Sequence, residues 1–493
     1  MGLNADRGIC HPPPGTRQSR QAVRFSLGKP ILTLLLAAAV SGVAVWRRAG
    51  APRADLIVWS FDQTHVRTFR DPLPGTVGRS APSLFDQFRR QTGFSAAISL
   101  MGQMGQNVRL GSAFMSGASG PSAPDLCEIE IHSIGQFLRP PVDDIGLLPL
   151  NDFLEQSGWD RRIVASRLAP WSKTDPRTGR RIVYGIPQDV HPVTITYRKD
   201  LFDQAGIDPR QAGTWSRFQG LCLAFQDYWA AHGRPDRRAI ALSTDSPDEI
   251  VEMLLQRHVN LIDQSNRLHF NDAKVLETVV FYARLVAGQR AIGADVSPGV
   301  GWTQDLERGN VCAVCTPDWK ADDLREFAPD LSGKVAMMPL PRFDADDAPT
   351  STLGGTMVGI CRSCPHPETA WKLLEFLYLG PEAIRARLAA GDNVLPAIPQ
   401  YWSDPAYHKG DPFFAGGQNI GDMYVTLAGQ IPERFVTPYS YQAELALAAV
   451  MHRARQYVAA DRRMDGLDRA CAGWLAEAQE DVQRRIDFGN FEP

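Results

Sequence analysis

One segment, residues 184–215, constrains the fold of this chain more than any other; it reads YGIPQDVHPVTITYRKDLFDQAGIDPRQAGTW. A tight GIP turn precedes an apolar run that alternates as far as Tyr197, and such alternation predicts a strand. A short amphipathic helix follows, Gly206 stops it, and Thr214 begins the next helix. The segment therefore predicts a strand–helix unit of an α/β fold.

Strands and helices are predicted to alternate along the rest of the chain. Apolar runs at 54–61, 94–101 and 124–131 predict strands, and amphipathic segments at 83–91 and 108–115 predict helices. Further strands are expected at 239–243, 311–316, 334–340 and 357–361, and further helices at 133–138, 248–257, 272–287, 367–379 and through most of 442–487. The alternation favours a mostly parallel α/β sheet. A chain of 493 residues exceeds one compact core, so two or more lobes are expected.

The first fifty residues predict a targeting segment. Basic residues, the last of them Lys29, precede an apolar run at 31–46. The run is shorter than the roughly twenty residues of a membrane-spanning helix and fits the apolar region of a signal peptide. Arg47 and Arg48 directly after it leave an uncleaved signal anchor as the alternative. More basic residues lie before the run than after it, so the bulk of the chain is expected outside the cytoplasm.

Charge and motif content exclude several classes of function. The formal net charge is −3, and acidic and basic residues are interspersed, so no basic face for nucleic acid is predicted. The GxSxG elbow, the HExxH helix and the GxxxxGK[ST] phosphate loop are all missing from the sequence. No catalytic residue and no cofactor is therefore predicted. Glu128 and Glu130, two apart on a predicted strand, leave a glycosidase-like carboxylate pair open.

Two CxxC pairs, Cys312/Cys315 and Cys361/Cys364, permit a four-thiolate zinc site. Residues three apart on a strand point to opposite faces, which argues against a shared metal ion. An extracytoplasmic compartment favours disulfides. We therefore expect no metal and a disulfide within or between these segments, with buried free thiols as the alternative.

Four segments in order resemble the family 1 extracellular solute-binding proteins of ABC importers, a group that includes maltodextrin- and sugar-binding proteins. The first is the segment at 184–215. The other three are LERGNVCA at 306–313 running on to Trp319, MMPLP at 337–341 leading to a Gly-Gly pair, and HPETAWKLLEFL at 366–377 followed by LPA at 395–397. Together they cover most of residues 54–445.

The resemblance implies an α/β, periplasmic-binding-protein-like fold of two α/β lobes with a hinge and an inter-lobe cleft. Lobe one is expected at 54–188 plus 360–412 and lobe two at 189–359 plus 413–493, with chain crossings near 188–192, 359–362 and 411–421. Sequence patterns alone show only that loops or strand ends lie at these crossings.

The function implied by the resemblance is that of an extracytoplasmic receptor that binds a sugar or oligosaccharide in the cleft by hinge closure. Its expected partners are a carbohydrate ligand and the transmembrane subunits of an ABC permease. We expect a monomer that contacts the membrane only through the N-terminal segment. The alternatives are a membrane-tethered carbohydrate sensor or scaffold and an extracellular carbohydrate-active enzyme.

Sugar chemistry and the resemblance together predict the ligand contacts. The apolar C–H faces of a sugar stack on aromatic rings, worth about 1 kcal/mol each beyond burial. The hydroxyls need charged partners, and a buried one left unpaired costs about 1–3 kcal/mol. The predicted contacts lie at strand and loop ends and are Trp59, Asp62, Glu128, Asp189, Trp302, Trp319, Gly354, Gly355 and Tyr441.

Trp319 matches the family pattern most closely among these residues. Asp189 follows the GIP turn, where related maltodextrin binders carry an acidic contact. Trp302 lies in a Gly/Pro-rich loop, where a large ring has little reason to be core. Gly354 and Gly355 would let the backbone approach a ligand closely, with a plain turn as the alternative.

The remaining predicted contacts each have a structural alternative. Trp59, near the end of the first strand beside Asp62, suits the core of its lobe equally well. Glu128 suits an exposed strand edge. Tyr441, at the start of the last helical region, suits packing against its lobe.

Overall fold

The computed structural model describes residues 54–73, 81–117, 123–243, 246–297, 299–389, 394–460 and 465–489. The predicted targeting segment and its apolar run at 31–46 lie outside the described residues. Among those residues, no helix combines the length and the apolar character needed to cross a membrane.

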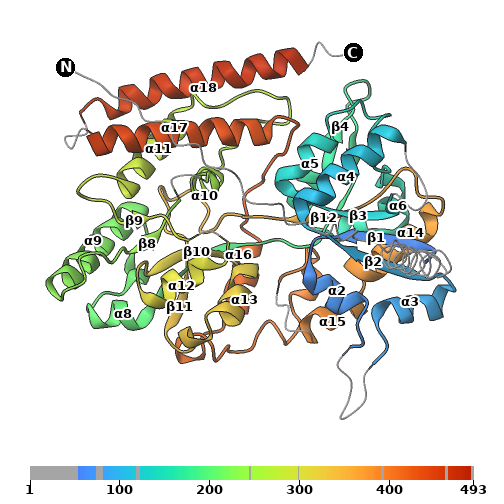
Figure 1. Ribbon diagram of the computed structural model, residues 1–493, viewed down its shortest axis with the longest axis horizontal. Coiled ribbons are helices and arrows are strands. Elements are labelled where there is room, and N and C mark those ends of the chain that lie inside the picture. The colour runs from blue at the N-terminus through green and yellow to red at the C-terminus, as the bar shows by residue number, and fades with distance from the viewer. Residues whose placement is uncertain are drawn as a thin grey trace, which may run out of the picture. The chain divides into compact units, whose positions relative to one another are not determined.

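A five-stranded sheet with the order β2-β1-β3-β12-β6 forms the centre of the first lobe (Figure 1). Strands β1 (Leu56–Ser60), β2 (Ala96–Leu100) and β3 (Leu126–Glu130) are parallel to one another. Strand β12 (Thr356–Ile360) pairs antiparallel with β3 on one side and with the short β6 (Ile186–Pro187) on the other. The sheet thus collects strands from distant parts of the chain.

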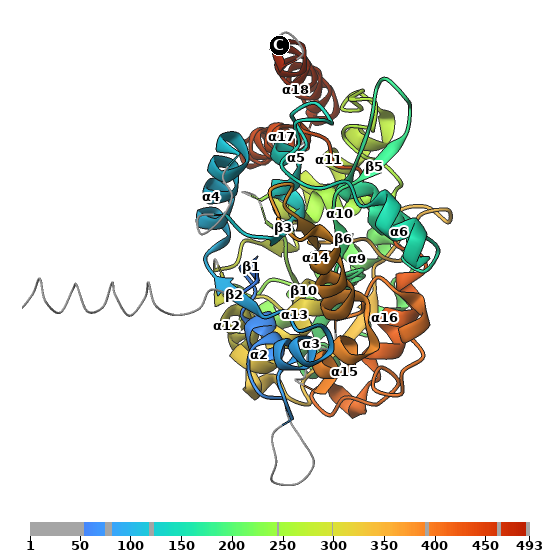
Figure 2. The ribbon, with the colours of Figure 1, turned by 90° about the vertical axis from the view of Figure 1, so that its right-hand side faces the viewer.

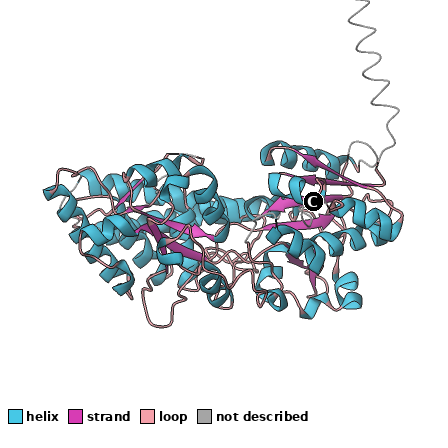
Figure 3. Cartoon of the chain, turned by 90° about the horizontal axis from the view of Figure 1, so that it is seen from below, coloured by secondary structure: helices cyan, strands magenta, loops and turns pink. Residues whose placement is uncertain are grey.

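A three-stranded sheet with the order β10-β7-β11 forms the centre of the second lobe, and Figure 3 shows the strands gathered in two separate groups with helices around each. The central β7 (Val193–Arg198) is buried at all six positions and is antiparallel to both β10 (Ala313–Pro317) and β11 (Val335–Pro339). The prediction of a mostly parallel sheet is therefore wrong for this lobe. Strands β10 and β11, which are joined through α13 (Asp318–Phe327), run in the same direction, but β7 enters the lobe from the crossing between the two sheets and runs opposite to both strands.

Helices cover both sheets. Around the first sheet lie α2 (Gln63–Phe69), α3 (Leu84–Thr92), α4 (Gln103–Ser116), α5 (Ile131–Phe137), α6 (Asn151–Ser157), α7 (Ala165–Leu168), α14 (Pro367–Leu374) and α15 (Pro381–Ala389). The second lobe contains α8 (Lys199–Gln204), α9 (Trp215–Ala231), α10 (Asp248–Gln256), α11 (Ala273–Val286), α12 (Gly301–Arg308), α13 (Asp318–Phe327), α16 (Ile420–Ala428), α17 (Ser440–Ala460) and α18 (Leu467–Gly489). Two small sheets pair β4 (Ser172–Thr174) with β5 (Arg181–Val183) and β8 (Ile240–Ala241) with β9 (Gly293–Ala294).

Local sequence signals account for the helix ends. In α3, the Ser83 hydroxyl accepts a hydrogen bond from the Asp86 amide at 3.1 Å, and Gly93 ends the helix with a φ of 81°. The predicted helix at 367–379 is one continuous element, α14 followed by a π-helical turn at Glu375–Leu379. The predicted helical tail is confirmed as α17 and α18, which pack against each other.

The chain crosses between the two sheets at residues 188–192, between β6 and β7, and again ahead of Thr356. The predicted lobe boundary at residue 359 would divide β12, which belongs wholly to the first sheet. One apolar cluster also joins the lobes: it contains Val58 of β1, Val335 of β11 and Phe414, which forms an isolated β-bridge with Val335. The two lobes therefore share buried apolar surface.

Candidate functional site

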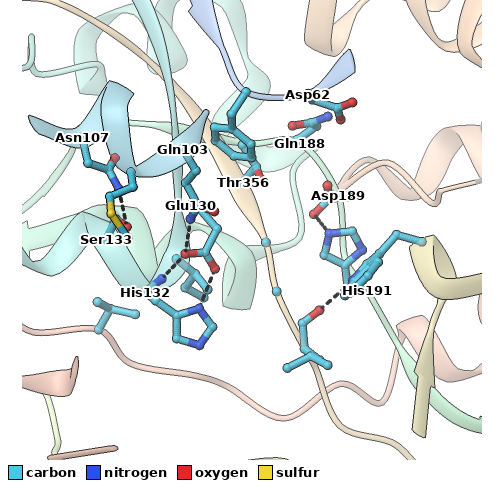
Figure 4. Close-up of a pocket in the computed structure, with 18 of the residues that line it drawn as sticks. Asp62, Gln103, Asn107, Glu130, His132, Ser133, Gln188, Asp189, His191 and Thr356 are labelled. Atoms are coloured by element: carbon cyan, nitrogen blue, oxygen red, sulfur yellow. Dashed lines mark hydrogen bonds and ion pairs between the residues drawn. The ribbon is translucent and has the colours of Figure 1, made fainter. Parts of the chain in front are cut away.

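A cavity of about 1430 Å³ lies where elements of both lobes meet (Figure 4). Its walls come from α2, α4, α5 and α15 of the first lobe and from α10 and α13 of the second. Residues within 188–191 and 353–356, at the crossings, and within 434–444, which run into α17, also line it. Single residues complete the lining: Phe61, Asp62, Glu130 and Val394. The volume exceeds the roughly 300–1000 Å³ of a usual small-molecule site, so the cavity has room for an elongated guest.

A buried ion triad centred on His191 forms part of the cavity wall. The His191 Nε2 atom lies 2.7 Å from Asp189 Oδ1, and its Nδ1 atom lies 2.6 Å from Asp318 Oδ1. Burial by itself disfavours the imidazolium, but the carboxylates of Asp189 and Asp318 outweigh that penalty and raise the pKa of His191 to about 9. The ring is thus a cation at neutral pH, held between an aspartate of the crossing segment and one at the start of α13.

Two glycines bring the backbone of residues 353–356 against the cavity. Gly354 has a φ of 79° and Gly355 a φ of 133°, values that side chains disfavour. A Cβ atom on Gly355 would lie 2.6 Å from Nη2 of Arg167. The Arg167 guanidinium is itself fixed, because it donates to the carbonyl of Asp189 and to Thr352 Oγ1, each at 3.1 Å. Gly355 therefore leaves room for Arg167 behind the cavity wall, whereas Gly354 lies against Trp319 and His191.

Trp319 borders the cavity at the start of α13 and is partly buried. Its backbone amide donates to Asp318 Oδ1 at 3.0 Å, and its indole Nε1 donates to the Leu353 carbonyl at 3.4 Å. The Lys320 ammonium lies 5.6 Å from the ring centroid. A ring fixed in this way offers an aromatic surface to a guest at little cost in side-chain entropy.

Glu128 does not line the cavity, because hydrogen bonds with buried neighbours occupy it fully. One oxygen lies 2.5 Å from His65 Nδ1 and accepts from the Tyr378 hydroxyl at 2.5 Å, and the other accepts from Ser60 Oγ at 2.5 Å. Burial opposes the charge on His65, but Glu128 and Asp62 outweigh burial and raise the pKa of His65 to about 9. Glu128 thus holds α2 in place, and the α2 N-cap Asp62 reaches the cavity instead.

Trp59 and Trp302 are also placed away from the cavity. Trp59 is 7% exposed and packs in the first-lobe core with Leu110 and Cys127, because the alternation of β1 points it inward. Trp302 belongs to α12 and not to a loop, and it packs with Leu306 at 7% exposure. The sequence around an aromatic residue at a strand or loop end is similar whether its side chain faces the core or the cleft.

The other six predicted contacts line one continuous cavity: Asp62, Asp189, Trp319, Gly354, Gly355 and Tyr441. Asp62 comes from the first lobe and Trp319 from the second, so residues 257 positions apart in the sequence meet here. Their role in ligand binding stays a prediction.

Sequence reasoning missed a polar network on the α5 side of the cavity. Glu130 pairs with His132 Nδ1 at 2.6 Å and accepts from Gln103 Nε2 at 3.2 Å. Arg434 donates to Glu444 at 2.7 Å, and its Nη2 lies 3.3 Å from His132 Nε2. Burial opposes protonation of His132, and the hydrogen bond to Glu130 overcomes it and raises the pKa of His132. Arg434 and His132 are 302 positions apart in the sequence, so no local sequence pattern predicts that they pair.

The expected disulfides at the CxxC pairs are not present. All seven cysteines among the described residues are buried and free, including Cys312, Cys315, Cys361 and Cys364. Burial raises the pKa of Cys312 and of Cys364 to about 12, which keeps both as thiols. Within the part of the chain that the structure describes, no group of three or more His, Cys, Asp or Glu side chains is placed to hold a metal ion.

Comparisons with known proteins agree with this architecture. The family model for bacterial extracellular solute-binding proteins matches residues 112–379. An arabinooligosaccharide-binding protein of Halalkalibacterium halodurans is 24% identical over 397 residues, which are 78% of this chain and 81% of that protein. The solved sugar-binding protein MalE of Xanthomonas citri superposes with a TM-score of 0.67 at 18% identity, covering 89% of this chain and all of that one. The ABC transporter associated binding protein of B. animalis subsp. lactis, solved with β-1,6-galactobiose, gives 0.63 at 17% identity over 88% of this chain and 97% of that one.

Proposed function

This chain belongs to the bacterial extracellular solute-binding proteins, and we propose that it is the extracytoplasmic receptor of an ABC importer that binds a sugar or oligosaccharide in the cavity. The observation that carries the proposal is that Asp62 of the first lobe, Asp189 of the crossing and Trp319 of the second lobe line one cavity. Carboxylates and an aromatic ring around one space are what a polyhydroxylated ring requires.

Each of these side chains has a distinct part in the proposed complex. The Asp62 and Asp189 carboxylates accept hydrogen bonds from sugar hydroxyls, which is the charge-assisted and stronger kind of bond. The Trp319 indole stacks on the C–H face of a sugar ring. His191 in the cavity wall positions Asp189 through the 2.7 Å ion pair, and Arg167 behind the wall positions it through the 3.1 Å hydrogen bond to its carbonyl.

Hinge closure is the proposed response to ligand. A guest that touches both lobes gains contacts only when the lobes approach, so it stabilises the closed state and shifts the population toward it. Residues 188–192 and the glycine pair Gly354 and Gly355 lie between the lobes and are the proposed pivots. We propose that the closed form is recognised by the transmembrane subunits of an ABC permease.

The proposal includes no covalent chemistry. The family and the relatives are binding proteins. A carboxylate pair of Glu128 and Glu130 receives no support from the geometry, because Glu128 is fully buried behind the cavity wall. We further propose a monomer outside the cytoplasm, with residues 31–46 acting as a cleaved signal peptide or as an anchor.

The test is a saccharide panel against the purified full chain, read by thermal shift and isothermal titration calorimetry. The panel contains arabinooligosaccharides, β-1,6-galactobiose and maltose. We expect at least one sugar to raise Tm and the Trp319→Ala variant to lose about 1 kcal/mol or more of binding free energy. The matched control is Trp474→Ala on α18, which removes a partly buried indole that does not line the cavity and leaves affinity unchanged. A folded protein that binds no sugar, or equal affinity in both variants, refutes the proposal.

A further inference from the structure

Helix α4 carries a solvent-exposed apolar stripe, defined by Met104, Val108 and Met115. The stripe follows the spacing of one helical face, with Gly111 completing the series at 104, 108, 111 and 115. Met104 is 82% exposed, Val108 68% and Met115 90%. Apolar helix faces normally pack against a core, and aligned apolar side chains left exposed on one face are a feature of binding surfaces.

The stripe is not the core-facing side of α4. Leu110 and Ala113 supply that side and are buried, with Leu110 in the same cluster as Trp59 and Cys127 of the first sheet. Helix α4 therefore has two apolar faces, of which one holds it to its lobe and the other is free. Figure 2 shows α4 at the margin of the first lobe.

The stripe belongs to the same cavity as the proposed sugar contacts. Met104, Val108 and Met115 all line it, together with Val436 and the half-exposed Tyr441 of a second wall. Figure 4 shows Gln103 and Asn107 of α4 on the opposite side of the cavity from Asp189 and His191. The cavity thus joins a polar region at the ion triad to an apolar region along α4.

The polar side chains of α4 that face the cavity already have partners. Asn107 Nδ2 donates to Ser133 Oγ at 2.8 Å, and Gln103 Nε2 donates to Glu130 Oε2 at 3.2 Å. What α4 offers a guest is therefore mainly the apolar stripe. Methionine suits such a role, because its flexible thioether adapts to guests of different shape.

We propose that the α4 stripe is a second subsite that takes an alkyl or aryl group attached to the saccharide bound beside Trp319 and Asp189. This inference rests on the proposed function, since it assigns the polar region to a sugar. It makes the natural ligand an amphiphilic glycoside or a sugar bearing an acyl or aryl substituent. The observation that supports this inference is that one cavity contains both the α4 stripe and the polar region at the ion triad, so a single guest can contact both.

The experiment compares each sugar with its own octyl glycoside, at concentrations below micelle formation. The pairs are arabinobiose, β-1,6-galactobiose and maltose with their octyl glycosides, titrated calorimetrically into the full chain. Each methylene buried on the stripe is expected to lower Kd about fourfold, so an octyl chain that buries three or more gives at least about fiftyfold. A triple variant, Met104→Ser with Val108→Ser and Met115→Ser, loses that gain and keeps the affinity for the bare sugar.

The control variant is Leu445→Ser, which removes an exposed apolar side chain of α17 that does not line the cavity. It keeps the full gain from the octyl group. If neither bare nor octyl sugars bind, the proposed function fails and this inference fails with it. If bare sugars bind and the octyl group adds nothing, or the gain survives in the triple variant, only the inference is overturned. It is also overturned if analytical ultracentrifugation finds a dimer that the triple variant abolishes, because the stripe is then a contact between copies.

Discussion

The ion triad of Asp189, His191 and Asp318 makes a quantitative prediction about stability in alkaline solution. The pKa of His191 rises from 6.5 to about 9 in the folded protein, because two carboxylates outweigh its burial. The folded state therefore binds the proton more tightly than the unfolded state does. Stability from this group is complete below about pH 6.5 and is lost as the pH rises through 9.

The size of the effect follows from the same shift. One pKa unit corresponds to about 1.4 kcal/mol, so the change from 6.5 to about 9 contributes roughly 3 kcal/mol to the free energy of unfolding. That is a large part of the 5–15 kcal/mol that is usual for a folded protein. His65 has its pKa raised to about 9 as well, so the wild-type profile sums two such losses.

A variant of His191 distinguishes its contribution to the free energy of unfolding from that of His65. His191→Gln removes the titrating ring and leaves the Asp189 and Asp318 carboxylates without the cation between them, so this variant is less stable than the wild type at neutral pH. The assay is urea unfolding followed by tryptophan fluorescence, at steps between about pH 6 and pH 10. The control is His452→Gln, an exposed position on α17.

We expect the difference in unfolding free energy between wild type and His191→Gln to shrink by roughly 3 kcal/mol across that range. The control variant follows the wild type at every pH. Parallel profiles for wild type and His191→Gln would refute the reasoning, since they would mean that His191 is not held as a cation.

Three further perturbations have defined outcomes. Gly355→Ala places a Cβ against Arg167 at a positive φ, and we expect it to lower the free energy of unfolding by about 2–4 kcal/mol in chemical denaturation. Gly354→Ala meets only a 3.4 Å contact and is expected to lower it by about 1 kcal/mol. Equal losses in the two variants would contradict the close approach of Gly355 to Arg167. Glu128→Gln removes the buried negative charge beside a histidine and is expected to lower Tm while leaving the affinity for sugar within a few-fold; a selective loss of affinity would place Glu128 in the site after all. The buried thiols, Cys361 among them, are expected to react with a disulfide reagent only after unfolding, and labelling of the native protein would show that the cores around them open.

Local patterns predicted most elements of this fold because each is encoded within a few residues. The run that ends at Tyr197 became β7, and Thr214 caps α9 by accepting from the Arg217 amide at 3.3 Å. Strand direction was not predictable in this way. It depends on which sheet a strand joins, and β7 and β12 join sheets across lobe crossings that no periodic pattern records.

The candidate site was predictable only in part. Asp189 and Trp319 follow directly from the ends of recognisable units, so their position at a shared cavity could be expected. The burial of Glu128 could not, because its partners His65 and Tyr378 lie 63 and 250 positions away. A strand with alternating acidic residues looks alike whether one face meets solvent or a buried histidine.

The apolar cluster that contains Val58, Phe414 and Val335 has a consequence for how the molecule melts. Because side chains of both lobes form this cluster, the unfolding of one lobe exposes apolar side chains of the other lobe to water. A calorimetric scan is therefore expected to give a single heat-absorption peak, and excised halves are expected to precipitate. The hinge closure that we propose would therefore have to leave this shared apolar cluster buried and free of water.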